Sequence, residues 1–321
     1  MKYRPLGNSG IEVSEVTLGC WPIAGMTSPG VNDADSVATI GECFELGINH
    51  LDTAYMYGRR GESERLIAQA LGERRDEMII ASKGGLHWED GREGAIHDAR
   101  PATLRRECEE SLRRLQTDRV ELLYLHAPDR NVPIAESAGE LKRLMDEGKA
   151  RAVGASNVDV EQLEAFAAEC PLSAYQPPYN MLQRDIERDT LPWCRQHNVA
   201  VLVYWPLLKG LLGGKLRRDQ DFTGDSRAKY PLFQGDEYQR NLDMVERLRE
   251  LAGRSGHSVA QLAVKWILHQ SGITSAICGA KRPDQIRETA AASDWQLDAA
   301  ELAEIDTILA ERGPVEVEPP V

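Results

Sequence analysis

A (β/α)8 TIM barrel of the α/β class, with an N-terminal β-hairpin and extra helices, is the fold that the sequence predicts. Short apolar runs alternate with charge-rich stretches of helical length, as in repeated βα units around a parallel sheet. Eight such units occur within 321 residues, a length common for this barrel. No linker or low-complexity segment interrupts the body of the chain. We therefore expect one domain over residues 1–321, with a C-terminal tail at about 312–321.

Each predicted strand is an apolar run typical of a buried parallel strand. In chain order the runs are VTLGC from Val16, INHLDTA from Ile48, MIIASK from Met78, VELLYLH from Val120, ARAVGASN from Ala150, LSAYQPPYN from Leu172, VAVLVYW from Val199 and ITSAICG from Ile273. Before them, YRPLGNSGIEVS has turn residues between two short extended pieces. This segment predicts a hairpin that closes the bottom of the barrel.

The stretches between the strands have helical patterns. DSVATIGECFELG spaces its apolar residues by about 3.6 and ends at Gly47, whereas PATLRRECEESLRRL opens with Pro101, which suits a first helical turn. EQLEAFAAEC, RDTLPWCRQH and PDQIRETAAA supply further crossovers. DEYQRNLDMVERLRELAGRSG is followed directly by SVAQLAVKWILHQ. Two helices therefore stand where one is needed, and we expect one of them to be an insertion.

The composition is that of a soluble globular protein, with 42% hydrophobic and 28% charged residues. The formal net charge of -13 disfavours nucleic acid as a partner, because phosphate binding needs concentrated Lys and Arg. Six cysteines form no C-x-x-C pair, so we expect reduced thiols and no metal site. The chain opens without a signal-peptide pattern, and its longest apolar run, VAVLVYWPLL, is about half a membrane helix. We therefore expect a cytoplasmic protein with no membrane partner.

Polar side chains follow nearly every predicted strand. In a (β/α)8 barrel the functional groups lie where the strands end, at the C-terminal face. The residues at these positions are Asp52, Thr53, Tyr55 and Tyr57 after the second strand, Ser82 and Lys83 after the third, His126 after the fourth, Ser156 and Asn157 after the fifth, Gln176 on the sixth, Tyr204 and Trp205 on the seventh and Gly279 on the eighth. Their convergence indicates a site at this face.

Six motifs in register with these strand ends resemble those of the aldo-keto reductase superfamily, in particular its bacterial-type NADP(H)-dependent oxidoreductases. They are NHLDTAYMYG, IIASKGG, LLYLHAPD, AVGASN, YQPPYN and the GLLGGK loop, in this order. The resemblance extends from about Leu6 to Leu309. It implies an NADP(H)-dependent enzyme with a small-molecule substrate. The enzyme would reduce an aldehyde, ketone or sugar, or oxidise the corresponding alcohol.

Carried over residue by residue, the family's catalytic tetrad falls on Asp52, Tyr57, Lys83 and His126. Carbonyl reduction needs a proton donor near the carbonyl oxygen, and Tyr57 is the predicted donor. A free phenol has a pKa of about 10, and an ammonium at Lys83 is expected to lower it, with Asp52 holding that lysine charged. His126 would polarise the carbonyl. Each residue taken alone also has a structural interpretation. Tyr57 would be a packing aromatic, Lys83 a surface charge and Asp52 a helix cap, and His126 would be a histidine of the core.

The resemblance also implies a cofactor site without a glycine-rich nucleotide fingerprint, and neither G-x-G-x-x-G nor a P-loop motif is present. Ser156, Asn157 and Gln176 would hydrogen-bond the nicotinamide carboxamide, and Tyr204 would stack on its ring. The remaining expected contacts near the pyrophosphate are Trp205, Pro206, Leu207, Gly210, Gly213, Gly214, Lys215 and Gly279. Strand capping, core packing and a plain flexible loop are the competing interpretations.

After the eighth strand, GAKRPDQIRET brings Lys281 and Arg282 to a helix N-terminus, where a phosphate can bind. This favours NADPH over NADH, with Gln285 and Glu288 facing the adenosine; a solvated charge pair is the alternative. Two positions depart from the family pattern. Trp205 replaces a usual small residue and Thr289 a usual asparagine, which puts cofactor affinity in doubt.

Loops over the barrel mouth are expected to form the substrate pocket. The candidates are Trp21, Trp88 and the segment between Gly214 and Tyr238; either tryptophan would also serve as a structural lid. A cofactor-binding regulatory subunit without physiological turnover is the rival function. A metal-dependent hydrolase is a weaker one, because only His126 lies at a strand end. The sequence leaves substrate identity, reaction direction and oligomeric state open.

Overall fold

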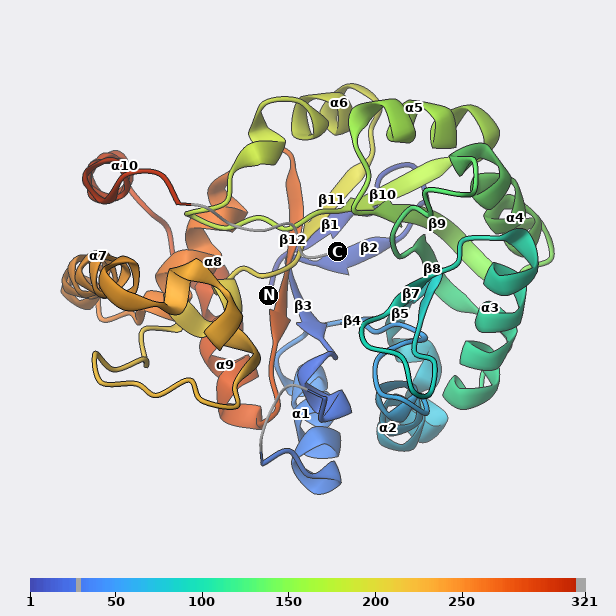
Figure 1. Cartoon of the computed structure of the whole chain (residues 1–321), viewed down its shortest axis with the longest axis horizontal. Helices are drawn as coiled ribbons and strands as arrows, with labels where there is room; N and C mark the ends of the chain where they lie inside the picture. Colours follow the sequence, from blue (N-terminus) through green and yellow to red (C-terminus); the bar gives the residue numbers. More distant parts are fainter. Residues whose placement is uncertain (27–29, 316–321) are drawn as a thin grey trace.

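Eight parallel strands close into a barrel in the computed structural model, which describes residues 1–26 and 30–315 (Figure 1). The barrel strands are β3 (Val16–Gly19), β4 (His50–Asp52), β5 (Ile79–Gly84), β8 (Val120–Leu125), β9 (Ala150–Ser156), β10 (Leu172–Gln176), β11 (Ala200–Val203) and β12 (Ile273–Gly279). Seven of them lie within the predicted apolar runs, and β5 extends one residue beyond its run, to Gly84. The barrel closes where β12 pairs with β3 in parallel register. The predicted TIM barrel is therefore confirmed.

Helices surround the barrel. The α-helices are α1 (Asp33–Glu45), α2 (Glu62–Leu71), α3 (Pro101–Leu115), α4 (Ile134–Asp146), α5 (Val160–Glu169), α6 (Thr190–Gln196), α7 (Gly235–Arg254), α8 (Val259–His269), α9 (Pro283–Ala290) and α10 (Ala299–Arg312). The short 3-10 helices are η1 (Pro22–Ala24), η2 (Gly72–Glu77), η3 (Asp185–Glu187), η4 (Leu208–Gly213), η5 (Ser226–Lys229), η6 (Pro231–Phe233) and η7 (Ala291–Asp294). Pro101 occupies the first turn of α3, as predicted.

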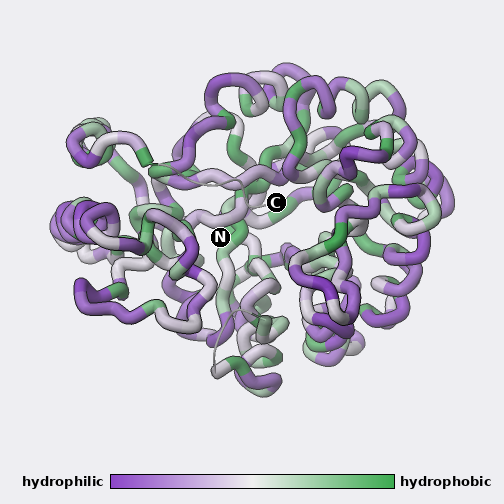
Figure 2. The backbone as a smooth tube through the Cα atoms, viewed as in Figure 1, coloured by the Kyte–Doolittle hydropathy of each residue, from purple (hydrophilic) through white to green (hydrophobic). Residues whose placement is uncertain are grey.

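Alternation along the strands divides the core into two layers. On β8, Leu123 and Leu125 join the layer between the barrel and the helices, whereas Leu122 and Tyr124 point into the barrel interior. Both faces of the strand are buried, so its sequence is a continuous apolar run. Figure 2 shows the corresponding arrangement, with hydrophobic segments inside and hydrophilic segments toward the outer helices.

The N-terminal hairpin closes one end of the barrel, as predicted. It consists of β1 (Tyr3–Pro5) and β2 (Glu12–Ser14), paired antiparallel. Leu6, Ile11 and Val13 from this segment pack against the side chains of the barrel interior. The backbone approaches the barrel closely at Gly7, where an added Cβ would lie 2.3 Å from the carbonyl oxygen of Ser173. The hairpin therefore packs closely against the barrel interior and plugs this end of the barrel.

Three elements extend beyond the minimal barrel. Helix α8 packs against β12, whereas α7 packs against α10, and these two lie together at one side of the molecule (Figure 1). Helix α7 is therefore the extra helix of the predicted pair. A second hairpin, β6 (Leu86–His87) with β7 (Ile96–His97), follows β5 and was not predicted. Helix α10 takes up the start of the predicted tail at 312, and the tail residues 316–321 lie outside the described part.

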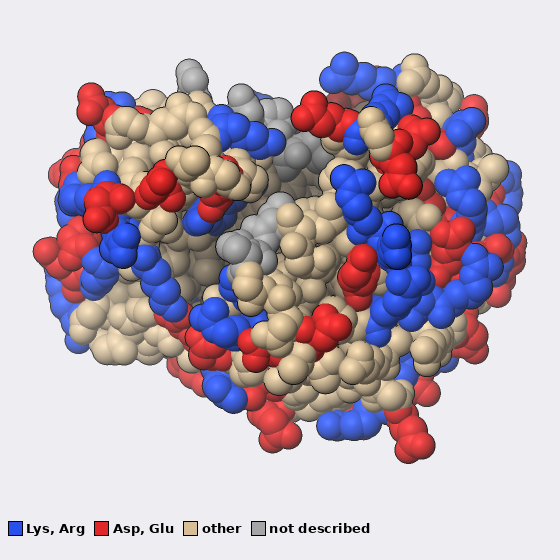
Figure 3. Space-filling view, turned by 60° about the horizontal axis from the view of Figure 1, so that its bottom comes forward, with Lys and Arg blue, Asp and Glu red and all other residues tan. Residues whose placement is uncertain are grey.

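Surface charges are interleaved. Figure 3 shows acidic and basic side chains mixed over one face of the molecule. Many form ion pairs, such as Arg105 with Glu147 and Lys149 with Glu109, both at 2.7 Å. Exposed pairs of this kind contribute little to stability, about 0–1 kcal/mol each. Among the helices built from residues 1–26 and 30–315, none has both the length and the apolar character that crossing a membrane requires.

The fit of the hairpin plug predicts a difference between two glycine substitutions. Gly10→Ala places an alanine at φ +72° in open space, so it should lower the free energy of unfolding by only about 1 kcal/mol. Gly7→Ala has the same backbone problem and also meets the backbone of Ser173, so it should cost about 3 kcal/mol or more. Urea unfolding measures both. Equal losses in the two variants would contradict the proposed fit.

Candidate active site

A buried ion pair joins two adjacent strands at the barrel mouth. Lys83 at the end of β5 donates hydrogen bonds from Nζ to Asp52 Oδ1 at 2.6 Å and to the Thr53 carbonyl oxygen at 2.8 Å. From β10, Gln176 Nε2 donates to Asp52 Oδ2 at 2.7 Å. Both side chains of the ion pair are almost fully buried. Both Asp52 oxygens are therefore satisfied, as a buried carboxylate requires.

Tyr57 lies directly against this pair. Its hydroxyl is 3.3 Å from Lys83 Nζ, and a turn closed by Tyr57 N–H donating to the Ala54 carbonyl oxygen holds the loop. The ring is half-buried and packs edge-on against His126, with ring centroids 6.0 Å apart. The structure therefore brings the four residues of the predicted tetrad together at one place.

Burial and charge set the protonation states here. Burial raises the pKa of Tyr57 well above its ordinary value, and the negative charge of Asp52 adds to this effect. Burial lowers the pKa of Lys83, while Asp52 opposes that change. The expected lowering of the Tyr57 pKa is therefore wrong, because burial of the phenol raises its pKa and the charge of Asp52 raises it further. The phenol keeps its proton, which a proton donor must hold at the start.

His126 is a neutral histidine at the same mouth. Burial lowers its pKa well below the ordinary value, and the nearby charge of Lys83 lowers it further. Its Nδ1 atom is buried without a hydrogen-bond partner in the described residues. A buried polar atom in this state calls for an additional partner. A ligand in the mouth can supply it.

The polar residues predicted to hold a nicotinamide form one hydrogen-bonded group. Tyr204 donates from its hydroxyl to Asn157 Oδ1 at 2.7 Å, and Asn157 Nδ2 donates to the His126 carbonyl oxygen at 2.9 Å. Ser156 donates from Oγ to the Gln176 carbonyl oxygen at 2.7 Å. Asn157 itself has φ +59°, a left-handed conformation that asparagine tolerates better than most residues. The network links β9, β10 and the end of β11.

The loop after β11 has an unusual backbone. Trp205, Leu208 and Lys209 all have positive φ, as does Gly210 at +92°, while Pro206 and Leu207 lie between. Trp205, at φ +59°, therefore has a left-handed conformation that is unusual for a bulky residue. Within this turn the N–H of Leu208 donates to the Trp205 carbonyl oxygen and that of Gly210 donates to the Leu207 carbonyl oxygen, both at 2.9 Å.

Lys209 is a residue that the sequence did not single out. Its Nζ lies 3.7 Å from the Trp205 ring centroid and 4.4 Å from that of Tyr230. Burial lowers its pKa to about 8, with Lys229 as a second cause. No sequence motif predicts the contact between Lys209 and Tyr230, because the two residues are far apart in the chain. Tyr230 belongs to the long segment between Gly214 and Tyr238. That predicted pocket segment also contains a packed cluster of Phe222, Phe233 and Tyr238.

The predicted phosphate-binding residues lie at the start of α9, next to the end of β12 at Gly279. Arg282 pairs with Asp284 at 3.1 Å, in line with the alternative of a solvated charge pair, and Lys215 pairs with Glu288 at 2.6 Å. The backbone N–H of Lys281 donates to Gln285 Oε1 at 2.9 Å.

The ion pair between Lys215 and Glu288 joins the loop that follows η4 to helix α9. It therefore brings the predicted pyrophosphate segment next to the predicted adenosine segment. Thr289, which departs from the family pattern, is buried and donates to carbonyl oxygens of its own helix. Thr289 is therefore occupied within α9.

The two predicted pocket tryptophans lie beside Tyr57. Trp21 packs edge-on against the Tyr57 ring with centroids 5.1 Å apart, and Trp88 Nε1 donates to the Met56 carbonyl oxygen at 2.7 Å. All three aromatic rings cover one small apolar cluster at the mouth. Arg59, which the sequence did not single out, lies over the Trp88 ring at 5.7 Å. The tryptophans therefore border the phenol.

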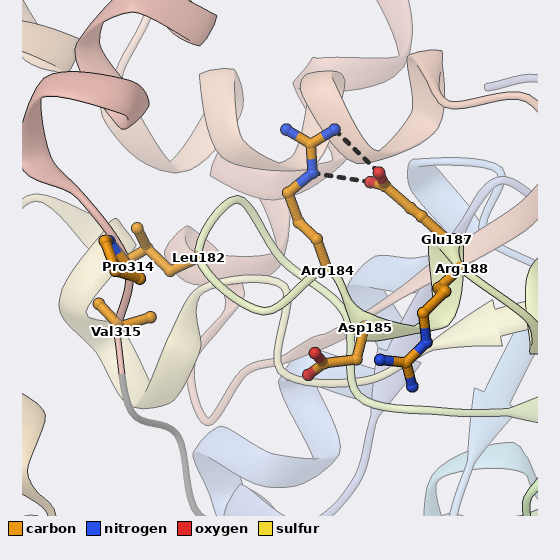
Figure 4. A pocket seen from close by; sticks show the side chains of 7 residues that line it. All are labelled: Leu182, Arg184, Asp185, Glu187, Arg188, Pro314 and Val315. Atoms are coloured by element: carbon orange, nitrogen blue, oxygen red, sulfur yellow. Dashed lines mark hydrogen bonds and ion pairs between the residues drawn. The ribbon is translucent and has the colours of Figure 1, made fainter.

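A surface pocket elsewhere contains none of the predicted site residues (Figure 4). It lies between the loop around η3 and the residues that follow α10. Its lining consists of Leu182, Arg184, Asp185, Glu187, Arg188, Pro314 and Val315. Arg184 and Glu187 bind each other there at 2.8 Å, so their charges are already paired.

The buried ion pair predicts a non-additive loss of stability. Asp52→Asn leaves the Lys83 ammonium buried without its counter-ion, so the free energy of unfolding should fall by about 3–5 kcal/mol. Replacing both partners, as Asp52→Asn with Lys83→Met, removes the unpaired charge and should recover part of that loss. Chemical denaturation of the two variants measures the difference. A double variant that is less stable than Asp52→Asn alone would contradict this account.

Comparisons with known proteins agree with this architecture. The family model "Aldo/keto reductase family" matches residues 15–310. The chain is 39% identical to the aldo-keto reductase YhdN of Bacillus subtilis (strain 168), over 96% of this chain and 94% of that protein. It is 36% identical to the NADH-specific methylglyoxal reductase of Escherichia coli (strain K12), over 94% and 96%.

Solved structures show the same similarity. The glycerol dehydrogenase AKR11B4 from Gluconobacter oxydans superposes with a TM-score of 0.90 at 38% identity, covering 99% of this chain and 98% of that one. The aldo-keto reductase AKR11C1 from Bacillus halodurans, in its holo form, gives a TM-score of 0.80 at 29% identity, covering 96% of each chain. With its closed parallel barrel and a family match over nearly its whole length, the chain belongs to the aldo/keto reductase family of oxidoreductases.

Proposed function

We propose that this protein transfers hydride between NADP(H) and the carbonyl or alcohol group of a small molecule, with Tyr57 as the proton donor. The observation that carries the proposal is the 3.3 Å contact between the Tyr57 hydroxyl and the Lys83 ammonium. That phenol lies among two tryptophans at the mouth of the barrel, where substrates bind in this fold. A reduced nicotinamide, when bound, supplies the hydride.

The residues present fit a nicotinamide cofactor. His126 Nδ1 is a buried polar atom without a partner in the described residues, and the hydrogen-bonded group around Asn157 lies beside it. A carboxamide offers both a donor and an acceptor for such a group. On the loop after β11, Gly210 has no side chain, so the backbone there can approach an anion such as a pyrophosphate closely. Ser156, Gln176 and Tyr204 would complete the contacts to the ring.

The chemistry of this chain is a proton transfer at one hydroxyl. Tyr57 begins protonated, because its pKa is raised by burial, and gives its proton to the carbonyl oxygen as negative charge develops there. The resulting phenolate stands next to the Lys83 ammonium, which stabilises it more than the neutral phenol. Asp52 keeps that ammonium charged. Neutral His126 can donate one hydrogen bond to the carbonyl without adding a second charge.

We propose NADPH as the preferred cofactor. Lys281 and Arg282 directly precede α9, where their cationic side chains can bind a 2'-phosphate together. The ion pair between Arg282 and Asp284 is exposed, so a phosphate can replace its carboxylate at little cost. The Escherichia coli relative is named NADH-specific, so NADH is the alternative that an experiment must separate.

The role of Tyr57 can be tested by removing its hydroxyl and comparing the effect on kcat with that of the same change at Tyr55. Tyr57→Phe should lower kcat for carbonyl reduction by about 10²–10⁴-fold, because the proton donor is lost, while cofactor binding is retained. The matched control is Tyr55→Phe in the same loop, whose hydroxyl donates instead to Glu110 on α3. It should keep most of the activity.

Cofactor consumption is followed over aldehydes, ketones and polyols, with methylglyoxal and glycerol included because two relatives are named for them. Equal losses in both tyrosine variants would argue against Tyr57 as the donor. Tight cofactor binding by the unmodified protein without turnover of any of these compounds would instead favour the regulatory alternative.

The cofactor preference is tested separately. Lys281→Ala and Arg282→Ala should raise the KM for NADPH about tenfold or more and leave that for NADH nearly unchanged, since each charge-assisted contact contributes about 1.5–3 kcal/mol. Arg287→Ala is the control, because Arg287 lies on the same helix but pairs with Glu42. If the ratio of the two KM values stays constant in both site variants, the proposed NADPH preference is wrong.

A further inference from the structure

Glu107 is a buried carboxyl group that the proposed chemistry does not use. It lies on α3, and its side chain has no exposed surface. A buried carboxyl group is costly unless both of its oxygens form hydrogen bonds. Here Oε2 accepts the backbone N–H of Gly85 at 2.7 Å, and Oε1 is hydrogen-bonded to His87 Nδ1 at 2.8 Å. Both partners belong to the segment that starts the β6–β7 hairpin.

The surroundings of this carboxyl group favour its neutral form. Burial raises the pKa of Glu107 to about 8, and Asp98 and Glu110 raise it further, against the N–H of Gly85 and the charge of Arg106. Burial also lowers the pKa of His87. At neutral pH the contact therefore joins two largely uncharged side chains. It fixes the hairpin without burying a net charge.

The hairpin leads from Glu107 to the proposed proton donor. At its base, Gly85 has φ +97° and its carbonyl oxygen accepts the N–H of Asp98 at 3.0 Å. Beyond His87 the chain reaches Trp88, whose Nε1 donates to the carbonyl oxygen of Met56, the residue before Tyr57. Trp88 and Tyr57 also cover the same apolar cluster. A continuous set of contacts thus runs from α3 to the Tyr57 loop.

We propose that Glu107 is a positioning residue for the active site: through Gly85 and His87 it fixes the β6–β7 hairpin, so that Trp88 holds the Tyr57 loop and borders the carbonyl pocket. Its effect on turnover rests on the function proposed above. Its effect on the position of Trp88 does not, which allows the two to be tested apart.

The first experiment measures the environment of Trp88 directly. The whole protein is labelled with 5-fluorotryptophan, and the ¹⁹F resonance of Trp88 is assigned with Trp88→Phe. Glu107→Leu removes both hydrogen bonds but keeps a side chain of similar size. It should shift or broaden the Trp88 resonance, while the resonances of the other tryptophans stay unchanged. Glu107→Gln can still accept from Gly85 and donate to His87, and should preserve it.

Two further variants make this result decisive. Glu109→Gln is the matched control, since Glu109 lies on the same helix but pairs with Lys149 on the outside, and it should leave the spectrum unchanged. If Glu107→Leu does not fold, His87→Phe removes one of the two contacts and should move the Trp88 resonance alone. An unchanged Trp88 resonance in the folded variants, or equal changes at every tryptophan, would overturn the proposal.

Kinetics then test whether Glu107 acts through Trp88. Glu107→Leu should raise the KM for the best carbonyl substrate about fivefold and change kcat by less than about twofold, because pocket binding is affected more than proton transfer. In the Glu107→Leu, Trp88→Phe double variant, KM should match that of Trp88→Phe alone. Additive effects would contradict an action through Trp88. If the unmodified protein shows no turnover, the proposed function fails and the ¹⁹F result still decides the positioning role.

Discussion

A lysine ammonium buried at the barrel mouth is the constraint on which the rest of the site depends. Removing this charge from water is costly, and the hydrogen bonds from Lys83 to Asp52, to the Thr53 carbonyl oxygen and to the Tyr57 hydroxyl offset that cost. The contacts with Asp52 and Thr53 require β4 and β5 to be neighbours in parallel register. Closure of the barrel brings Gln176 across to the second oxygen of Asp52. The same ion pair therefore joins three strands at the barrel mouth and holds the lysine of the proposed chemistry in place.

The barrel and the grouping of the site could be predicted from the sequence for physical reasons. Strands buried on both faces are continuous apolar runs, and polar residues such as Asp52, Lys83 and His126 at their C-terminal ends must meet at one face. The hairpin plug was also predictable, since its turn residues lie between two extended pieces. These features depend on local pattern and on closure of a parallel sheet, both of which the amino-acid order specifies.

Other features depend on distances that the order of residues does not contain. Tyr57 was expected to have a lowered pKa because Lys83 follows on the next strand, but burial of the phenol raises its pKa and the charge of Asp52 raises it further. Glu107 was not singled out, because its place in the sequence is that of one more acidic residue on an amphipathic helix, and its two hydrogen-bond partners, Gly85 and His87, come from the unpredicted β6–β7 hairpin. Lys209 was not predicted either, because its contact with Tyr230 joins residues about twenty positions apart in the chain.

A charged lysine, held by Asp52, stands beside a protonated Tyr57. NMR of the protein labelled with ¹⁵N at the lysine side chains can test this arrangement by following Lys83 Nζ across pH, with Lys83→Met for assignment. We expect an ammonium signal for Lys83 at neutral pH, protected from exchange by its buried hydrogen bonds, that changes in Asp52→Asn and responds to removal of the hydroxyl in Tyr57→Phe. A neutral amine at neutral pH, or an ammonium signal unaffected by either substitution, would contradict it.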